Sequence, residues 1–203
     1  MRELFSCERK LIKDKDYNLF SLLNELGSYY ITGSSAIVFR GLSYELQPST
    51  ASIFIVGERK IAKFRGLLRN IFSKYNLLIV EQSIEPKDYV EVEVYFENRF
   101  EKANLAILEK AIADALWKID WERNNVIYPI YCLLQQPLDL SLIKKHAKSY
   151  GAKVEGKLRW FLQTINNISA SRLYSVEGLA KEVRIKDSVA KEVEEAIRRV
   201  LGR

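Results

Sequence analysis

Hydrophobic positions in the first half of the chain change repeatedly between helical and strand-like spacing. We expect helices over residues 17–26, 34–40 and 58–72, and strands over residues 29–31, 52–56, 77–80 and 90–96. The clearest helix follows Asp16, a capping residue, and stops at Gly27. In the last strand valine alternates with glutamate, which predicts one solvated face. These runs predict a small mixed sheet flanked by helices.

Helical spacing dominates after residue 104. We expect helices over residues 105–117, 126–134, 139–150, 154–165, 175–184 and 187–201. The fold class is therefore α+β, a small mixed sheet followed by an all-α C-terminal half. We divide the chain into an N-terminal helical segment (1–28), an α/β core (29–103) and a helical C-terminal region (104–203). No strand longer than about four residues is expected beyond position 105.

The composition fits a protein that folds on its own apolar surface. Hydrophobic residues make up 48% of the 203 residues, with only 9 Gly and 4 Pro, which excludes disordered and fibrous classes. No apolar run approaches the roughly 18–20 residues that span a bilayer, and the charged start of the chain is unlike a signal peptide. We expect a cytoplasmic protein without a membrane partner. Abundant Lys, Glu and Arg also fit a thermophile.

The sequence has few of the residues that bind metals or carry out thiol chemistry. Cys7 and Cys132 are the only cysteines, and His146 is the only histidine. Two cysteines are too few for a disulfide framework or a cysteine-rich zinc site. We therefore expect no metal, no cofactor and a structural role for these three residues.

A Gly-Ser turn early in the chain carries the first resemblance to a known family. Residues 30–42 read YITGSSAIVFRGL and residues 49–56 read STASIFIV. This pattern resembles the opening of nucleotidyltransferase-fold proteins, in which such a turn enters a helix and the next strand bears an Asp-x-Asp pair for two metal ions. Gly33 and Ser34 stand at the turn, but Ser52 and Phe54 occupy the carboxylate positions. Neither can hold Mg²⁺, which prefers oxygen ligands. The resemblance implies a degenerate core without its chemistry.

Glu91 and Glu93 are the one replacement pair that the sequence offers. Alternate residues share one face of a strand, so the two carboxylates would lie together. The simpler interpretation is the solvated face of an antiparallel strand. An enzyme that uses such non-standard carboxylates stays as an alternative function.

A second resemblance covers more of the chain, roughly residues 29–166. Residues 104–119 read NLAILEKAIADALWKI, and LDLSLIKKHAKSYG and KLRWFLQTI follow. These runs resemble the C-terminal region of AbiEi-type antitoxins. The matching residues are Glu109, Lys110, Ala111, Asp114, Ala115 and Leu116, then Leu138, Asp139, Leu140, Ile143, Ala147, Tyr150 and Gly151. The family's members are transcriptional autorepressors of type IV toxin–antitoxin operons.

The resemblance to AbiEi-type antitoxins implies particular partners. These are double-stranded operator DNA and a nucleotidyltransferase-type toxin encoded nearby, and a homodimer is compatible with this role. Such regulators usually read DNA through an N-terminal winged helix-turn-helix. About 28 residues precede Tyr29, too few for that domain. Any DNA contact is then expected from basic helices.

Positive charge is concentrated in the second half of the chain. The net charge is +6, and residues 101–203 supply +5 of it (18 Lys+Arg against 13 Asp+Glu). Clustered cations suit DNA phosphates, because released counterions drive the affinity. The candidate DNA-binding residues are Arg59, Lys60, Lys63, Arg65 and Arg69, then Lys144, Lys145, Lys148, Lys153, Lys157 and Arg159. The alternative is that these residues form an ordinary solvated helix surface.

The remaining marked residues have structural interpretations. Glu109 and Asp114 are expected to pair rather than catalyse, and the tryptophans at positions 117, 121 and 160 to pack in the core. Residues 175–203 resemble a helix-turn-helix, yet the glutamates at 192, 194 and 195 would be repelled by phosphates. A helical hairpin or a dimerisation helix fits that segment better. The sequence thus favours a non-catalytic DNA-binding regulator, with an enzyme or a protein-interaction module as alternatives.

Overall fold

A five-stranded mixed sheet forms the centre of the protein. The computed structural model describes residues 18–42, 52–169, 180 and 182–202. The strands are β1 Tyr29–Thr32, β2 Ser52–Gly57, β3 Asn76–Glu81, β4 Tyr89–Phe96 and β5 Arg99–Ala106, in the order β3-β2-β1-β5-β4. Strand β1 is antiparallel to β2 and parallel to β5, β2 is parallel to β3, and β4 and β5 form a hairpin. The expected α+β class is confirmed.

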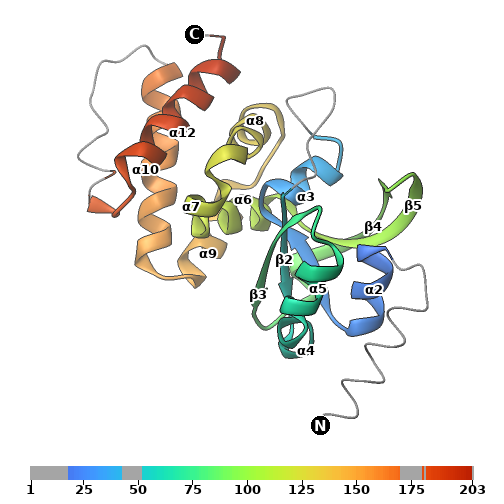
Figure 1. The fold of residues 1–203 in the computed structure, drawn as a ribbon. Coiled ribbons are helices and arrows are strands. Elements are labelled where there is room, and N and C mark those ends of the chain that lie inside the picture. The colour runs from blue at the N-terminus through green and yellow to red at the C-terminus, as the bar shows by residue number, and fades with distance from the viewer. Residues whose placement is uncertain (1–17, 43–51, 170–179, 181, 203) are drawn as a thin grey trace.

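Helices surround the sheet and then form a separate group beside it (Figure 1). The α-helices are α2 Leu19–Leu26, α3 Gly33–Phe39, α4 Arg59–Lys63, α5 Arg65–Ile71, α6 Leu108–Trp117, α7 Ile119–Glu122, α8 Ile127–Gln135, α9 Leu140–Ser149, α10 Ala152–Ser169 and α12 Asp187–Val200. The described residues also form two 3-10 helices, η1 Pro86–Asp88 and η2 Arg123–Asn125. Figure 1 shows α6 on one side of the central strands and α2 and α5 on the other.

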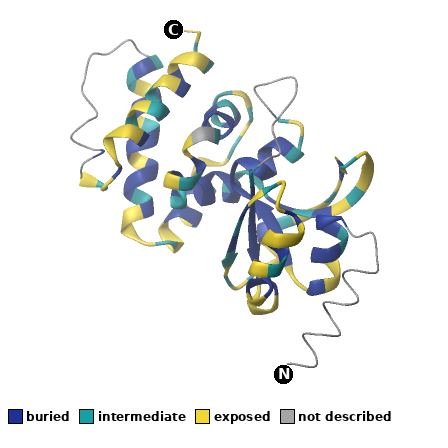
Figure 2. Ribbon diagram, viewed as in Figure 1, coloured by how far each residue is buried: buried dark blue, intermediate teal, exposed yellow. Residues whose placement is uncertain are grey.

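The central strands are covered on both faces, which explains their continuous apolar sequence. All four residues of β1 are buried, as are five of the six in β2. The buried apolar residues form one cluster that runs from Leu19 in α2 to Ile197 in α12. Figure 2 shows this dark interior where the sheet meets α6, with exposed residues on the outer sides of the helices. The sheet and the C-terminal helices therefore share one core.

Strand β5 is the main element that hydrophobic spacing did not predict. Hydrophobic spacing places residues 105 and 106 in the helix that follows, yet they complete the ladder with β4. The two-residue turn of the hairpin consists of Glu97 and Asn98, with φ of 50° and 66°. Such turns usually carry glycine, so the sequence lacked the ordinary signal. The predicted boundary between residues 103 and 104 falls inside this strand.

Two further expectations need adjustment. The single helix expected over residues 58–72 is divided at Phe64, whose ψ of 0° separates α4 from α5. The helix expected over residues 175–184 lies mostly outside the described residues. Within the described part of the chain, no helix is long and apolar enough to cross a membrane.

A buried carboxylate joins three elements of the core. Asp114 of α6 is fully buried and accepts hydrogen bonds from Thr32 Oγ1 at 2.7 Å, Lys110 Nζ at 2.6 Å and Tyr150 Oη at 2.5 Å. Lys110 is also buried, and its ammonium donates to the Tyr150 hydroxyl. We call Thr32, Lys110, Asp114 and Tyr150 the Asp114 cluster. It ties the end of β1 and the C-terminal end of α9 to α6.

Aromatic rings shield the Asp114 cluster from solvent. The Tyr150 ring stacks on Trp117 with centroids 4.5 Å apart, and Lys110 Nζ lies 4.7 Å from the Tyr150 centroid. Burial, and then the charge of Asp114, raises the pKa of Tyr150 well above its usual value. Tyr150 therefore stays a neutral donor over the whole physiological range. The structural role expected for Asp114 agrees with these contacts.

Removing the carboxylate of the Asp114 cluster should destabilise the whole protein. We expect Asp114→Ala to lower the free energy of unfolding by about 3–5 kcal/mol, because it leaves the Lys110 ammonium buried without a counter-charge. The double variant Lys110→Met, Asp114→Ala should recover much of this loss, since neither charge is then buried. Urea denaturation of both variants measures the effect. A loss below about 1 kcal/mol in the single variant would contradict a paired buried charge.

Candidate functional site

The Gly-Ser turn between β1 and α3 is closed by a carboxylate of the protein itself. Gly33 adopts a φ of +60°, and the Ser34 amide donates to Glu122 Oε1 at 3.3 Å. A Cβ atom at position 33 would overlap Glu122 Oε1, so only glycine leaves room for this carboxylate. Glu122 is 1% exposed, and its Oε2 has no hydrogen-bond partner among the described residues. Nothing in the sequence pattern had marked Glu122.

Side chains also fill the space beside β2, where a metal-binding pair was considered. The Ser35 hydroxyl donates to the Ser52 carbonyl at 3.1 Å and accepts from the Phe54 amide at 2.9 Å. The Phe54 ring lies 5.9 Å from that of Trp121 and 6.4 Å from that of Trp117. In the part of the chain that the structure describes, no group of three His, Cys, Asp or Glu residues could hold a metal ion. An aromatic contact thus stands where a carboxylate would be needed.

Glu91 and Glu93 do not replace the missing pair. Both are exposed on β4, an edge strand separated from β2 by two other strands. Glu91 Oε1 pairs with Lys102 Nζ at 3.0 Å across the hairpin. These glutamates belong to the outer face of the hairpin.

The first basic cluster lies on α4 and α5. Arg59, Lys60, Lys63 and Arg65 are exposed, and no ion pair joins them to a carboxylate of the described residues. Arg69 is exposed too, but its Nε donates to the Leu77 carbonyl at 3.0 Å. Four of the five cations thus have their charge turned to solvent.

Helix α9 separates its apolar and basic residues cleanly. Ile143, His146 and Ala147 are buried, and α9 packs on α6 and α10. The exposed residues include Lys144, Lys145 and Lys148, and Lys148 shares one side of the helix with the other two because it lies four and three positions from them. The helix begins at an effective cap, because Asp139 accepts from the Ser141 amide at 2.8 Å. His146 is a core residue, and burial lowers its pKa.

Lys157 does not belong to the basic surface. It is 6% exposed, and its ammonium donates to the carbonyls of Leu116 at 3.3 Å and Trp117 at 3.4 Å. Burial lowers the pKa of Lys157. This side chain joins α10 to the C-terminal end of α6, so including it among the DNA-binding residues was wrong. Lys153 and Arg159 are exposed on α10.

Helix α12 packs into the core along one stripe and carries its acidic residues outside it. Val189, Val193 and Ile197 are buried, and α12 contacts α8 and α10. The Oε2 atom of Glu192 lies 4.0 Å from the Nε atom of Arg123. The first helix of the considered helix-turn-helix lies mostly outside the described residues.

Comparisons of this chain with protein-family models, with curated proteins and with solved structures found no match. The contacts described above are therefore what bears on its function.

The buried carboxyl at the Gly-Ser turn should make stability depend on pH. Burial is the main cause that raises the pKa of Glu122 from 4.5 to about 7. Because the folded pKa is raised, the stabilising contribution is fully present below pH 4.5 and is lost as the pH rises through about 7. Over this pH range the contribution of Glu122 to the free energy of unfolding falls by about 3 kcal/mol.

Glu122→Gln is the matched variant, since its amide oxygen can still accept from Ser34. We expect the wild type to lose stability relative to Glu122→Gln between pH 4.5 and pH 8, as measured by urea denaturation across that range. Parallel pH profiles for the two proteins would show that Glu122 stays ionised in the fold.

Proposed function

We propose that this protein is a non-catalytic DNA-binding regulator that resembles AbiEi-type antitoxins and binds DNA phosphates through basic helices. The partners that the proposal implies are operator DNA and a nucleotidyltransferase-type toxin encoded nearby. The observation that carries it is the exposed lysine face of α9, formed by Lys144, Lys145 and Lys148. Phosphate binding needs several cations within reach of one backbone, and one helix side supplies three. Arg59, Lys60, Lys63 and Arg65 offer a second contact.

The packing of α9 against the rest of the protein supports its role as a phosphate-binding helix. Its apolar side packs on α6, and Tyr150 at its C-terminal end is bonded to Asp114. The lysines are therefore presented from a fixed backbone, which lowers the entropy lost on binding. No carboxylate of the described residues forms an ion pair with them. Lys145 interacts with Glu85 only through their charges, so all three ammonium groups are free to form a direct contact with a phosphate.

We propose further that β1, α3 and β2 are a degenerate nucleotidyltransferase-like core. The positive φ of Gly33, where β1 turns into α3, is compatible with this ancestry. The enzyme alternative needs carboxylates beside that turn. Glu122 occupies the turn itself, and Ser52 and Phe54 stand on β2. These contacts favour the non-catalytic role over the enzyme.

The non-catalytic role predicts no magnesium-dependent transfer from any of the four nucleoside triphosphates. The reason is that Glu122 fills the turn, that the neighbouring Asp114 is bonded to Thr32 and Lys110, and that no group of three His, Cys, Asp or Glu among the described residues could hold a metal ion. Incubation with labelled nucleotides and candidate RNA or protein acceptors measures transfer. Incorporation that Glu91→Ala or Glu93→Ala abolishes would establish the enzyme instead.

DNA binding should depend steeply on salt through α9. Each lost phosphate contact lowers the slope of log affinity against log salt by about 0.9, so replacing Lys144, Lys145 and Lys148 with alanine should flatten it by about two to three. Fluorescence anisotropy with duplex DNA at several salt concentrations provides the slopes.

A matched triple variant controls for the change in net charge. Lys74, Lys102 and Lys186 are exposed but each pairs with an acidic residue, and their replacement by alanine also removes three charges. We expect this control to keep the wild-type slope. Equal slopes for all three proteins would remove α9 from the interface. Absence of binding even at low salt would leave a protein-interaction module as the function.

A further inference from the structure

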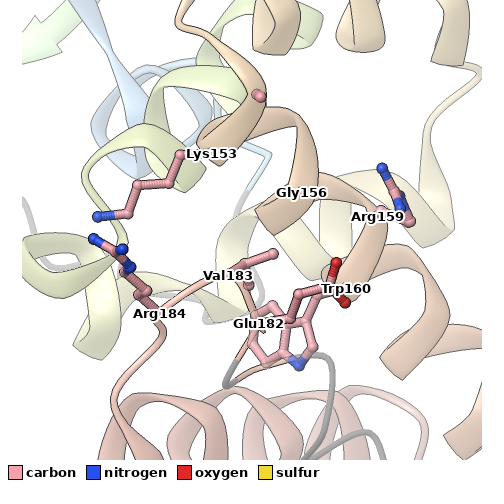
Figure 3. A pocket seen from close by; sticks show the side chains of 8 residues that line it. Lys153, Gly156, Arg159, Trp160, Glu182, Val183 and Arg184 are labelled. Atoms are coloured by element: carbon pink, nitrogen blue, oxygen red, sulfur yellow. The ribbon is translucent and has the colours of Figure 1, made fainter.

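A pocket away from the lysine face of α9 opens between α10 and the turn that precedes α12, and it includes Lys153 and Arg159 of the candidate DNA-binding residues. Its volume is about 460 Å³, within the range of sites for small ligands. Figure 3 shows its lining, to which α10 contributes Lys153, Gly156, Arg159 and Trp160, and the turn contributes Glu182 and Arg184. The pocket thus joins segments about 30 residues apart in the sequence.

The charges that line the pocket are unbalanced. Three cations against one carboxylate leave a net charge of +2. In Figure 3 the ends of Lys153 and Arg184 point toward one another from the two walls. No carboxylate of the described residues forms an ion pair with either of them. Two like charges held in this way repel one another, and an anion between them would relieve the repulsion.

The backbone around the pocket holds this arrangement at a cost. Arg184 adopts a φ of 57°, in the left-handed region that arginine rarely occupies, and the adjacent Ile185 amide donates to the Ala180 carbonyl at 2.9 Å. A Cβ atom at Gly156 would lie 2.6 Å from Val183 Cγ1, so glycine allows the turn to approach α10. Trp160 is 1% exposed, and its indole N–H has no hydrogen-bond partner among the described residues. The turn therefore packs closely against α10 along this wall of the pocket.

We propose that this pocket binds a phosphate group, with Lys153 and Arg184 as its two charged ligands. Arginine and lysine on opposite walls can donate several charge-assisted hydrogen bonds to one phosphate. A cavity of this size admits a ligand as large as a mononucleotide. The source of the phosphate is either a free nucleotide or a nucleic-acid backbone, and the chemistry is the same for both. The inference goes beyond the proposed function, because it does not use the lysines of α9.

Calorimetric titration of the full-length protein with inorganic phosphate and with AMP tests the pocket, and adenosine serves as the uncharged control. We expect both phosphate ligands to bind and adenosine not to bind. Arg184→Asn removes the charge, and asparagine tolerates the left-handed backbone. Lys153→Gln removes the opposite charge on α10. Each variant should raise the dissociation constant about tenfold or more.

Lys191→Ala is the matched control, since Lys191 is exposed on α12 and does not line the pocket. It should bind phosphate and AMP as the wild type does. A second titration with duplex DNA identifies the source of the phosphate. Loss of DNA affinity in Arg184→Asn and Lys153→Gln, but not in Lys191→Ala, would assign the pocket to a backbone phosphate. Loss of AMP affinity alone would assign it to a free nucleotide.

The proposal is overturned if Arg184→Asn and Lys153→Gln bind phosphate, AMP and DNA as tightly as Lys191→Ala does. It is also overturned if neither the phosphate ligands nor DNA bind with a dissociation constant below about 1 mM. Failure of the pocket and failure of the DNA surface are distinguishable. The alanine variants at 144, 145 and 148 report on α9 alone, and the substitutions at 153 and 184 report on the pocket.

Discussion

The carboxylate of Asp114 is the interaction on which the arrangement of this protein depends. A desolvated charge is tolerable only when its oxygens are occupied, and here a strand, its own helix and the end of α9 each provide a donor. The contacts are directional, unlike the apolar packing around them. They therefore fix the orientation of α6 against the sheet and of α9 against α6. The position of the lysine face follows from the Tyr150–Asp114 hydrogen bond, which holds the C-terminal end of α9, where Lys148 also lies.

Much of the fold could be predicted because burial follows periodicity. Strand β2 was visible as a continuous apolar run, and α9 was visible from Asp139, its cap, and from its stripe. The end of β5 could not be predicted, because residues 105 and 106 continue an apolar pattern that also suits a helix. What decides their state is long-range: Arg40 Nη2 donates to the Leu105 and Ala106 carbonyls. Such partners lie 65 positions away and leave no local signal.

The candidate sites could be predicted only in part, for a similar reason. Charge clusters are visible in a sequence, but the direction of each side chain is not. Lys157 resembles its neighbours in the sequence, and yet its ammonium donates hydrogen bonds to the carbonyls at the end of α6. Conversely, Glu122 matters because it contacts the Gly-Ser turn, and Arg184 matters because it is part of the turn before α12. Their importance comes from three-dimensional contact rather than from residue type or spacing.

Strand β4 ends the sheet, and its outer edge has backbone groups that no neighbouring strand pairs within the described structure. An exposed edge of this kind is a template on which another chain can extend a sheet. Glu91 and Glu93, the carboxylates that were considered as metal ligands, lie on this strand. A second copy pairing in antiparallel fashion would bring its own glutamates close to them, and like charges across strands are destabilising. The charge of these two residues therefore disfavours such pairing along β4.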